Sequence, residues 1–227
     1  MEKGLFCAEK RNIELGYYVS LPEDYRTDIR YPMIVFLHGA GERGNGREDL
    51  VKITKEGICR YLSEGKNYPA IILCPQCPCR LVWNNLVFEL KELIDRVAAQ
   101  YHADPHRISI TGISMGGYGT WEMGLTYPDF FSALAPVCGG GLSWRCENLV
   151  NMPIWALHGD MDPTVPCRNS VEMVDSVNEK GGHAKLTIFP GVDHHSWDSA
   201  YLETDVISWM LEQYREDFSR PKEAFEE

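Results

Sequence analysis

Short apolar runs recur along this chain, and segments with the period of an amphipathic helix separate them. Residues 33–37 and 70–74 are uninterrupted apolar runs, as expected for strands that are buried on both faces of a sheet. Comparable runs cover residues 108–111, 133–137, 154–157 and 185–189, and residues 13–21 alternate loosely like an antiparallel edge strand. Within the run at 133–137, Pro136 predicts an early end of the strand.

Helical patterns fill the intervals between these strands. Residues 86–101 place Leu90, Leu93 and Val97 on one stripe, and further helical patterns cover 118–125, 170–180 and 199–214. Alternating strands and helices predict an α/β fold with a mostly parallel central sheet and helices on both faces. Catalytic groups in such sheets lie at the carboxyl ends of the strands.

The length and composition favour one domain over residues 1–227. No linker or internal repeat divides the 227 residues, and 44% apolar residues can supply a sizeable core. The charged tail, from about 215 to 227, is expected to fray. The long segment 40–68 could cover one side of the molecule, whereas only sixteen residues separate Val137 from Ile154, so we expect no large cap domain.

The charge and the chain start bear on partners and location. A net charge of −11 disfavours nucleic acid and anionic membranes as partners. No apolar stretch approaches the roughly 20 residues of a membrane span, and the first residues lack a signal-peptide pattern. We therefore expect a cytoplasmic protein whose eight cysteines are reduced thiols, present as a monomer or a homodimer.

The pattern Gly-x-Ser-x-Gly at residues 112–116 follows a predicted strand and precedes a predicted helix. That context is typical of a nucleophile elbow, in which Ser114 would occupy a strained turn with its hydroxyl exposed. Alternatively, the segment is a glycine-rich turn or a phosphate-binding loop. It lacks the Gly-Lys-Ser/Thr ending of a Walker loop and the glycine spacing of a dinucleotide fingerprint.

Two later segments offer the partners that a serine nucleophile needs. Residues 158–166 (HGDMDPTVP) contain Asp160 and Asp162, and residues 190–197 contain His194 and His195. The order serine, acid, histidine accompanies a nucleophile elbow on an α/β sheet. Because each segment follows a predicted strand, we expect the three to share one rim of the molecule.

With these motifs in place, the chain resembles α/β-hydrolases of the compact carboxylesterase, phospholipase/carboxylesterase and dienelactone-hydrolase-like group. The resemblance rests on residues 37–44 (LHGAGERG), 112–117 (GISMGG), 158–166 (HGDMDPTVP) and 191–197 (GVDHHSW). It implies a serine carboxylesterase with a Ser-His-Asp triad, an acyl-enzyme intermediate and neither a metal nor another cofactor.

The resemblance assigns the catalytic roles to Ser114, Asp162 and His194. Asp160 remains the alternative acid. His195 remains the alternative base, because this chain has Asp193 where relatives usually have glycine and carries a second histidine. Histidines at positions like those of His38 and His158 are structural in the family, so the resemblance assigns these two residues no catalytic role.

Two backbone N–H groups are expected to stabilise the oxyanion of the tetrahedral intermediate. Met115, the residue after the nucleophile, supplies one, and the resemblance points to Ala40 for the other. Trp83, Trp144 and Trp197 fall in loops near the predicted rim and could line a substrate pocket, or they could serve packing alone.

Cys74, Cys77 and Cys79 form a Cys-x-x-Cys-x-Cys pattern that could hold a metal. Two prolines interleave the thiols and no further ligand follows at a suitable spacing, so we favour a proline-rich turn with no metal site.

The predicted function is hydrolysis of short-chain or aromatic acyl esters, with a small-molecule ester as the partner. The alternatives are a serine peptidase of the prolyl-oligopeptidase-like type, a thioesterase, and a non-catalytic binding protein on a hydrolase fold.

Overall fold

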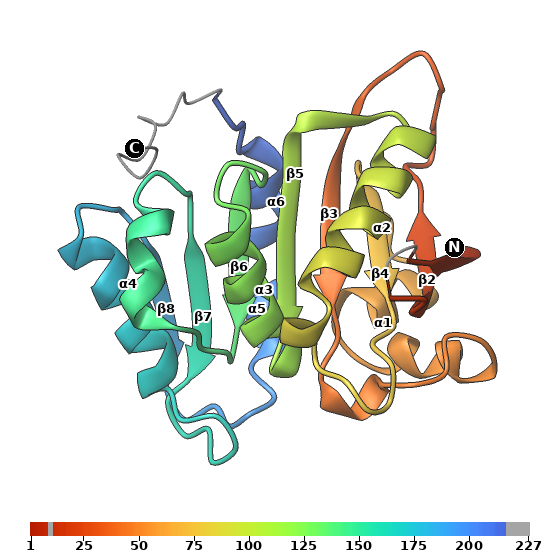
Figure 1. Ribbon diagram of the computed structural model, residues 1–227. Coiled ribbons are helices and arrows are strands. Elements are labelled where there is room, and N and C mark those ends of the chain that lie inside the picture. Colours follow the sequence, from red (N-terminus) through yellow and green to blue (C-terminus); the bar gives the residue numbers. More distant parts are fainter. Residues whose placement is uncertain (9–10, 217–227) are drawn as a thin grey trace.

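The computed structural model describes residues 1–8 and 11–216, which form one eight-stranded sheet covered by helices on both faces (Figure 1). The strands are β1 (Glu2–Cys7), β2 (Glu14–Ser20), β3 (Tyr31–Leu37), β4 (Ile71–Pro75), β5 (Ala103–Ile113), β6 (Ala133–Val137), β7 (Trp155–Gly159) and β8 (Lys185–Phe189). Their order across the sheet is β1-β2-β4-β3-β5-β6-β7-β8. β1, β2 and β4 pair antiparallel, and the remaining pairs are parallel.

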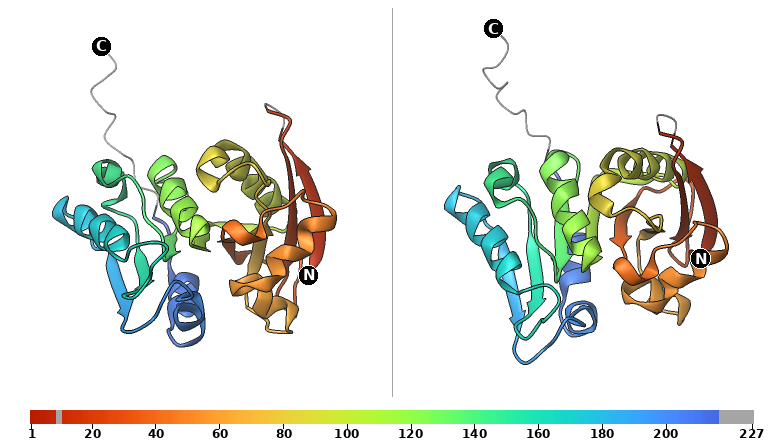
Figure 2. Two further views of the ribbon diagram at one scale, coloured as in Figure 1. Left: turned by 90° about the horizontal axis from the view of Figure 1, so that it is seen from below. Right: turned by 60° about the horizontal axis from the view of Figure 1, so that its bottom comes forward.

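The helices divide into two layers that bury separate cores (Figure 2). On one face lie α2 (Val87–Gln100), α3 (Met115–Thr126) and α4 (Arg168–Glu179), and on the other lie α1 (Gly57–Ser63), α5 (Trp197–Leu202) and α6 (Val206–Glu212). Short 3-10 helices are η1 (Ala40–Glu42), η2 (Glu48–Lys55), η3 (Trp83–Asn85) and η4 (Ser143–Leu149). This arrangement confirms the predicted α/β-hydrolase fold.

Several boundaries differ from the prediction. The sequence patterns missed β1 entirely, and β5 begins five residues before the predicted start at Ile108. β6 continues through Pro136, because its pairing with β7 is sparse there and rests on Leu134 opposite Ile154 and Val137 opposite Leu157. The missing N–H of Pro136 therefore removes little from the sheet.

The single helix predicted over residues 199–214 is wrong, since the structure has two helices there. The hydroxyl of Thr204 donates to the carbonyl oxygen of Ala200 at 2.6 Å and accepts the N–H of Val206 at 3.2 Å. The Thr204 hydroxyl thus takes up a carbonyl oxygen and an N–H group that a continuous helix would pair along its backbone. This competition accompanies the end of α5 and the start of α6.

The long connections place the functional loops. Segment 40–68 contains η1, η2 and α1, and the connection between β6 and β7 holds η4. None of the helices among the described residues combines the length and apolarity that crossing a membrane requires. From residue 217 on, the predicted charged tail lies outside the described residues.

Candidate active site

Ser114 occupies the turn between β5 and α3, with φ of 54° and ψ of −115°. A non-glycine residue in this region is strained and persists only where its surroundings hold it. A Cβ at Gly112 would lie 2.5 Å from the carbonyl oxygen of Gly116, and a Cβ at Gly116 would collide with the carbonyl oxygen of Leu37. Glycine at both positions therefore lets strand and helix approach closely enough for the turn to form.

The structure brings Ser114, His194 and Asp162 into one hydrogen-bonded series. Nδ1 of His194 lies 2.7 Å from Oδ2 of Asp162, and Nε2 lies 2.9 Å from Oγ of Ser114. An ionised carboxylate can only accept, so Nδ1 carries the proton and Nε2 is free to accept the serine hydroxyl proton. These three residues lie in the loops after β5, β7 and β8, and Figure 1 shows that these parallel strands end on the same side of the molecule.

The carboxylate of Asp162 is buried and receives four hydrogen bonds. The backbone N–H groups of Thr164 and Val165 each donate to Oδ1 at 2.8 Å. His194 donates to Oδ2, and Nε2 of His158 lies 3.2 Å from the same oxygen. Burial alone would raise the pKa of Asp162, but the hydrogen bonds from His194, Val165 and Thr164 hold it below its usual value. The aspartate is thus fixed in place and ionised.

The alternative acid and base lie elsewhere. Asp160 accepts the backbone N–H of Gly191 at 2.7 Å. The side chain of His195 is 69% exposed, and its ring packs 4.6 Å from that of Trp197. The geometry therefore favours Asp162 and His194 over their neighbours.

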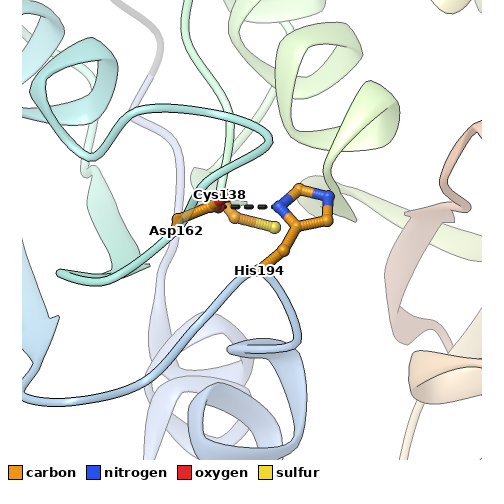
Figure 3. A group of neighbouring side chains, drawn as sticks. All are labelled: Cys138, Asp162 and His194. Carbon is orange, nitrogen blue, oxygen red and sulfur yellow. Dashed lines mark hydrogen bonds and ion pairs between the residues drawn. The ribbon is translucent and has the colours of Figure 1, made fainter.

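Cys138 follows β6 and contacts the backbone of Ser114, a contact that the sequence patterns did not predict. Its Sγ accepts the backbone N–H of Ser114 at 3.2 Å, and that N–H also donates to the carbonyl oxygen of Val137 at 3.0 Å. Figure 3 shows the Cys138 side chain beside the Asp162–His194 hydrogen bond. Like Ser114, Cys138 is a non-glycine residue with a positive φ, at 41°.

Donor atoms of Cys138, Asp162 and His194 lie within 4.8 Å of one another, which raises the question of a metal site. Burial raises the pKa of the Cys138 thiol to about 12, so it is a neutral thiol near neutral pH. The lone pairs of the Asp162 carboxylate already receive four hydrogen bonds. The donor set therefore suits a hydrogen-bonded series better than a cation.

The loop after β3 passes directly beside the nucleophile. A Cβ at Gly39 would lie 3.7 Å from the Cβ of Ser114. Ala40 begins η1 and is exposed, whereas Met115 begins α3 and is 9% exposed. Their role as oxyanion donors stays a prediction.

The prediction that Trp83 lines a substrate pocket is wrong. Trp83 has no exposed surface, and its indole N–H donates to the carbonyl oxygen of His38 at 3.0 Å. Its Cβ also packs against Gly119 of α3, where an added Cβ would lie 2.5 Å away. Burial of a large ring with a satisfied N–H makes Trp83 a packing residue under the loop.

The other two tryptophans differ in exposure. Trp144 lies in η4 and is 75% exposed, and Trp197 is 6% exposed. The ring of Trp197 meets that of His194 edge-on at 5.8 Å, and its indole N–H donates to a carboxylate oxygen of Glu56 at 3.0 Å. Contact with substrate stays a prediction for both residues.

The Cys-x-x-Cys-x-Cys segment is a turn whose thiols are all free, with Cys74 and Cys77 buried and Cys79 exposed. The backbone N–H of Cys77 donates to Nε2 of His38 at 2.9 Å. Among the described residues, the group of at least three ligating side chains that lie close together is the one around Cys138, and the absence of a metal from residues 74–79 stays a prediction.

Comparison with known proteins places this chain in a family. Residues 9–181 match the family described as "Putative esterase". Esterase Rv1288 of Mycobacterium tuberculosis (strain ATCC 25618 / H37Rv) is 26% identical over an alignment of 249 residues, which covers 93% of this chain and 51% of that protein. The chain spans about half the length, or less, of the curated relatives it matches.

Solved structures of esterases are also similar to this chain. A thermostable esterase is 32% identical with a TM-score of 0.80, over 94% of this chain and 63% of that one. The feruloyl esterase module of Clostridium thermocellum, solved with sinapinate, is 15% identical with a TM-score of 0.71, over 97% of this chain and 90% of that one. At that identity the likeness concerns the fold. Since the family match covers most of the chain, this chain belongs to the esterase family and has the α/β-hydrolase fold.

Proposed function

We propose that this chain hydrolyses short-chain or aromatic carboxylic esters through a covalent acyl-enzyme, with Ser114 as nucleophile, His194 as base and Asp162 as the acid that orients it. The observation that carries the proposal is the series from Ser114 Oγ through His194 to Asp162, with links of 2.9 and 2.7 Å. A serine hydroxyl is a weak nucleophile, and a neighbouring base held by a third group activates it.

Acylation begins when Oγ of Ser114 attacks the ester carbonyl carbon and Nε2 of His194 takes the hydroxyl proton. Asp162 stabilises the imidazolium, because its carboxylate accepts the Nδ1–H. The tetrahedral intermediate collapses as the carbon–oxygen bond to the alcohol breaks. His194 returns the proton to the leaving alkoxide, which departs as the alcohol.

Deacylation repeats these steps with water in place of serine. His194 removes a proton from water, the hydroxide attacks the acyl carbon, and the bond to Oγ breaks. The proton returns to Ser114 and the carboxylic acid leaves. In both halves, negative charge develops on the former carbonyl oxygen, where the N–H groups of Met115 and Ala40 would donate.

The surroundings of the nucleophile support a small or planar acyl group. The ring of Trp197 lies 5.8 Å from that of His194 and nearly perpendicular to it, and the β6–β7 connection carries the short η4 as its helix. The feruloyl esterase module of Clostridium thermocellum was solved with sinapinate, which is an aromatic acid. A site beside the Trp197 ring would accept such an acid as well as a short aliphatic chain.

The test is hydrolysis of p-nitrophenyl esters with acyl chains from two to twelve carbons, alongside a feruloyl ester, a thioester and a p-nitroanilide. We expect the highest kcat/KM for short or aromatic acyl esters. Ser114→Ala should lower kcat/KM by about 10⁴-fold or more, because the nucleophile is lost.

Two outcomes would redirect the proposal. Faster anilide than ester cleavage would favour a peptidase. Failure of the native protein on every substrate would favour a binding role for the fold.

A further inference from the structure

The loop that carries Ala40 is held by one segment of the chain, residues 75–83. The backbone N–H of Cys77 donates to Nε2 of His38 at 2.9 Å, and its carbonyl oxygen accepts the N–H of Gly44 at 3.1 Å. The indole of Trp83 donates to the carbonyl oxygen of His38 at 3.0 Å. Both ends of the loop are thus fixed by groups outside it.

Gln76 fixes the middle of the same region. It is 1% exposed, and Nε2 donates to the carbonyl oxygens of Glu42 at 2.9 Å and Asp49 at 2.8 Å. Oε1 accepts the backbone N–H of Gly46 at 2.9 Å. A primary amide has two N–H donors and a carbonyl acceptor, and here all three capacities are used on backbone groups. A carboxylate of the same shape could donate to neither carbonyl.

The methyl side chain of Ala40 makes no hydrogen bond. The position of the Ala40 backbone N–H therefore depends on how the rest of the loop is held. The Glu42 carbonyl that Gln76 holds lies in the same turn of η1, and Gly39 packs against Ser114. Oxyanion donors are effective only when they are fixed in advance at the position where charge develops, and a misplacement of about 1 Å can cost about 10²-fold in rate.

We propose that Gln76 is a positioning residue for the oxyanion loop, acting through the backbone of residues 42–49 on the N–H of Ala40. The inference rests on the proposed esterase function and extends it to a residue remote from the substrate. It also gives a role to the proline-rich segment, which holds the loop after β3.

Gln76→Glu and Gln76→Met test this proposal. Glutamate keeps the shape and removes both donors, and methionine keeps the approximate size without placing a charge in the interior. We expect each to lower kcat for a short ester by about 10- to 100-fold while KM changes by less than about three-fold. The Ki of a trifluoromethyl ketone, which forms a tetrahedral oxyanion on Ser114, should rise by the same factor as kcat/KM falls.

Asn178→Asp is the matched control. The Asn178 amide also holds a loop, since it donates to the carbonyl oxygen of Ala184 at 3.1 Å and accepts the Ala184 N–H at 2.7 Å. Asn178 lies in the last turn of α4, ahead of β8, which is an edge strand well separated from the β4 end of the sheet where Gln76 lies. This variant should lose stability but keep kcat and the ketone Ki.

The outcomes separate two failures. A native protein without Ser114-dependent ester hydrolysis would overturn the proposed function. A fully active native protein whose Gln76 variants keep native kcat and Ki, or lose them no more than Asn178→Asp, would overturn the role of Gln76 alone.

Discussion

At the scale of single residues, two strained backbones meet at the nucleophile. Ser114 and Cys138 both have positive φ, at 54° and 41°, and the N–H of Ser114 donates to Cys138 Sγ. Such conformations cost about 1–3 kcal/mol each and persist where neighbours hold them. The Gly-x-Ser-x-Gly motif predicts the strain at Ser114. Nothing in the sequence marks Cys138, because left-handed non-glycine residues carry no local pattern.

His38 gives a residue-scale prediction about pH. Burial lowers the pKa of His38 to about 4. The hydrogen bond to the Gly39 carbonyl oxygen acts against this shift, and the positive charge of Arg43 adds to it. The carboxylate of Glu42 lies 3.9 Å from Nδ1 of His38. As pH falls, His38 of the unfolded chain is protonated first, near pH 6.5, whereas His38 of the folded chain stays neutral until about pH 4. The contribution of neutral His38 to the free energy of unfolding is therefore present above pH 6.5 and is lost as pH falls toward 4. We expect this group to remove about 2 kcal/mol of unfolding free energy between pH 7 and pH 5.

Urea unfolding of the native protein and of His38→Gln at both pH values measures the effect. The variant should lose the His38 part of the pH dependence, whereas replacement of the exposed His183 should leave it intact. Equal pH dependence in native protein and His38→Gln would show that His38 does not remain neutral.

At the scale of elements, close approach between β3, β5 and α3 places the serine. Leu37 pairs with Gly112 at the end of β3, and the helix begins immediately after Ser114. The glycines at 112 and 116 admit this approach, so the strand–turn–helix unit was predictable from the sequence alone. The break between α5 and α6 was not, because the apolar stripe runs across it, whereas the hydroxyl of Thr204 hydrogen-bonds to the backbone at the break.

Gly116→Ala should therefore be severe and Gly41→Ala mild. The added Cβ at Gly116 meets the backbone of Leu37, whereas nothing lies within 4 Å of one at Gly41. We expect losses of more than about 3 kcal/mol for the first and less than about 1 kcal/mol for the second. Denaturant unfolding compares them, and similar losses would contradict the close approach seen at the elbow.

At the scale of the whole molecule, segments distant in sequence assemble the site. The carboxylate of Asp198, at the start of α5, accepts hydrogen bonds from Nη2 of Arg60 at 2.8 and 2.9 Å and from the hydroxyl of Tyr61. These bonds connect the segment after His194 to α1. Motif order predicted which loops share the rim, since parallel strands end together. Contacts such as Glu56 with Trp197, or Gln76 with the oxyanion loop, could not be predicted, because they depend on how loops of irregular shape pack.

The state of the eight cysteines tests the molecule as a whole. All are free, with Cys7 and Cys79 exposed, Cys167 partly exposed and the other five buried. With a thiol-reactive chromogenic reagent, we expect two fast reactions, one slower reaction and five more only after unfolding, because thiol reactivity follows exposure and ionisation. Fewer than eight thiols after unfolding would reveal a disulfide, and rapid reaction of Cys77 or Cys138 would contradict their burial.

Covalent labelling by a fluorophosphonate, located by peptide mass spectrometry, tests the central claim most directly. The account predicts one equivalent of label on Ser114, loss of ester hydrolysis in proportion to labelling, and no label on Ser114→Ala. Hydrolysis that continues in the fully labelled protein, or label on another serine, would contradict Ser114 as the nucleophile.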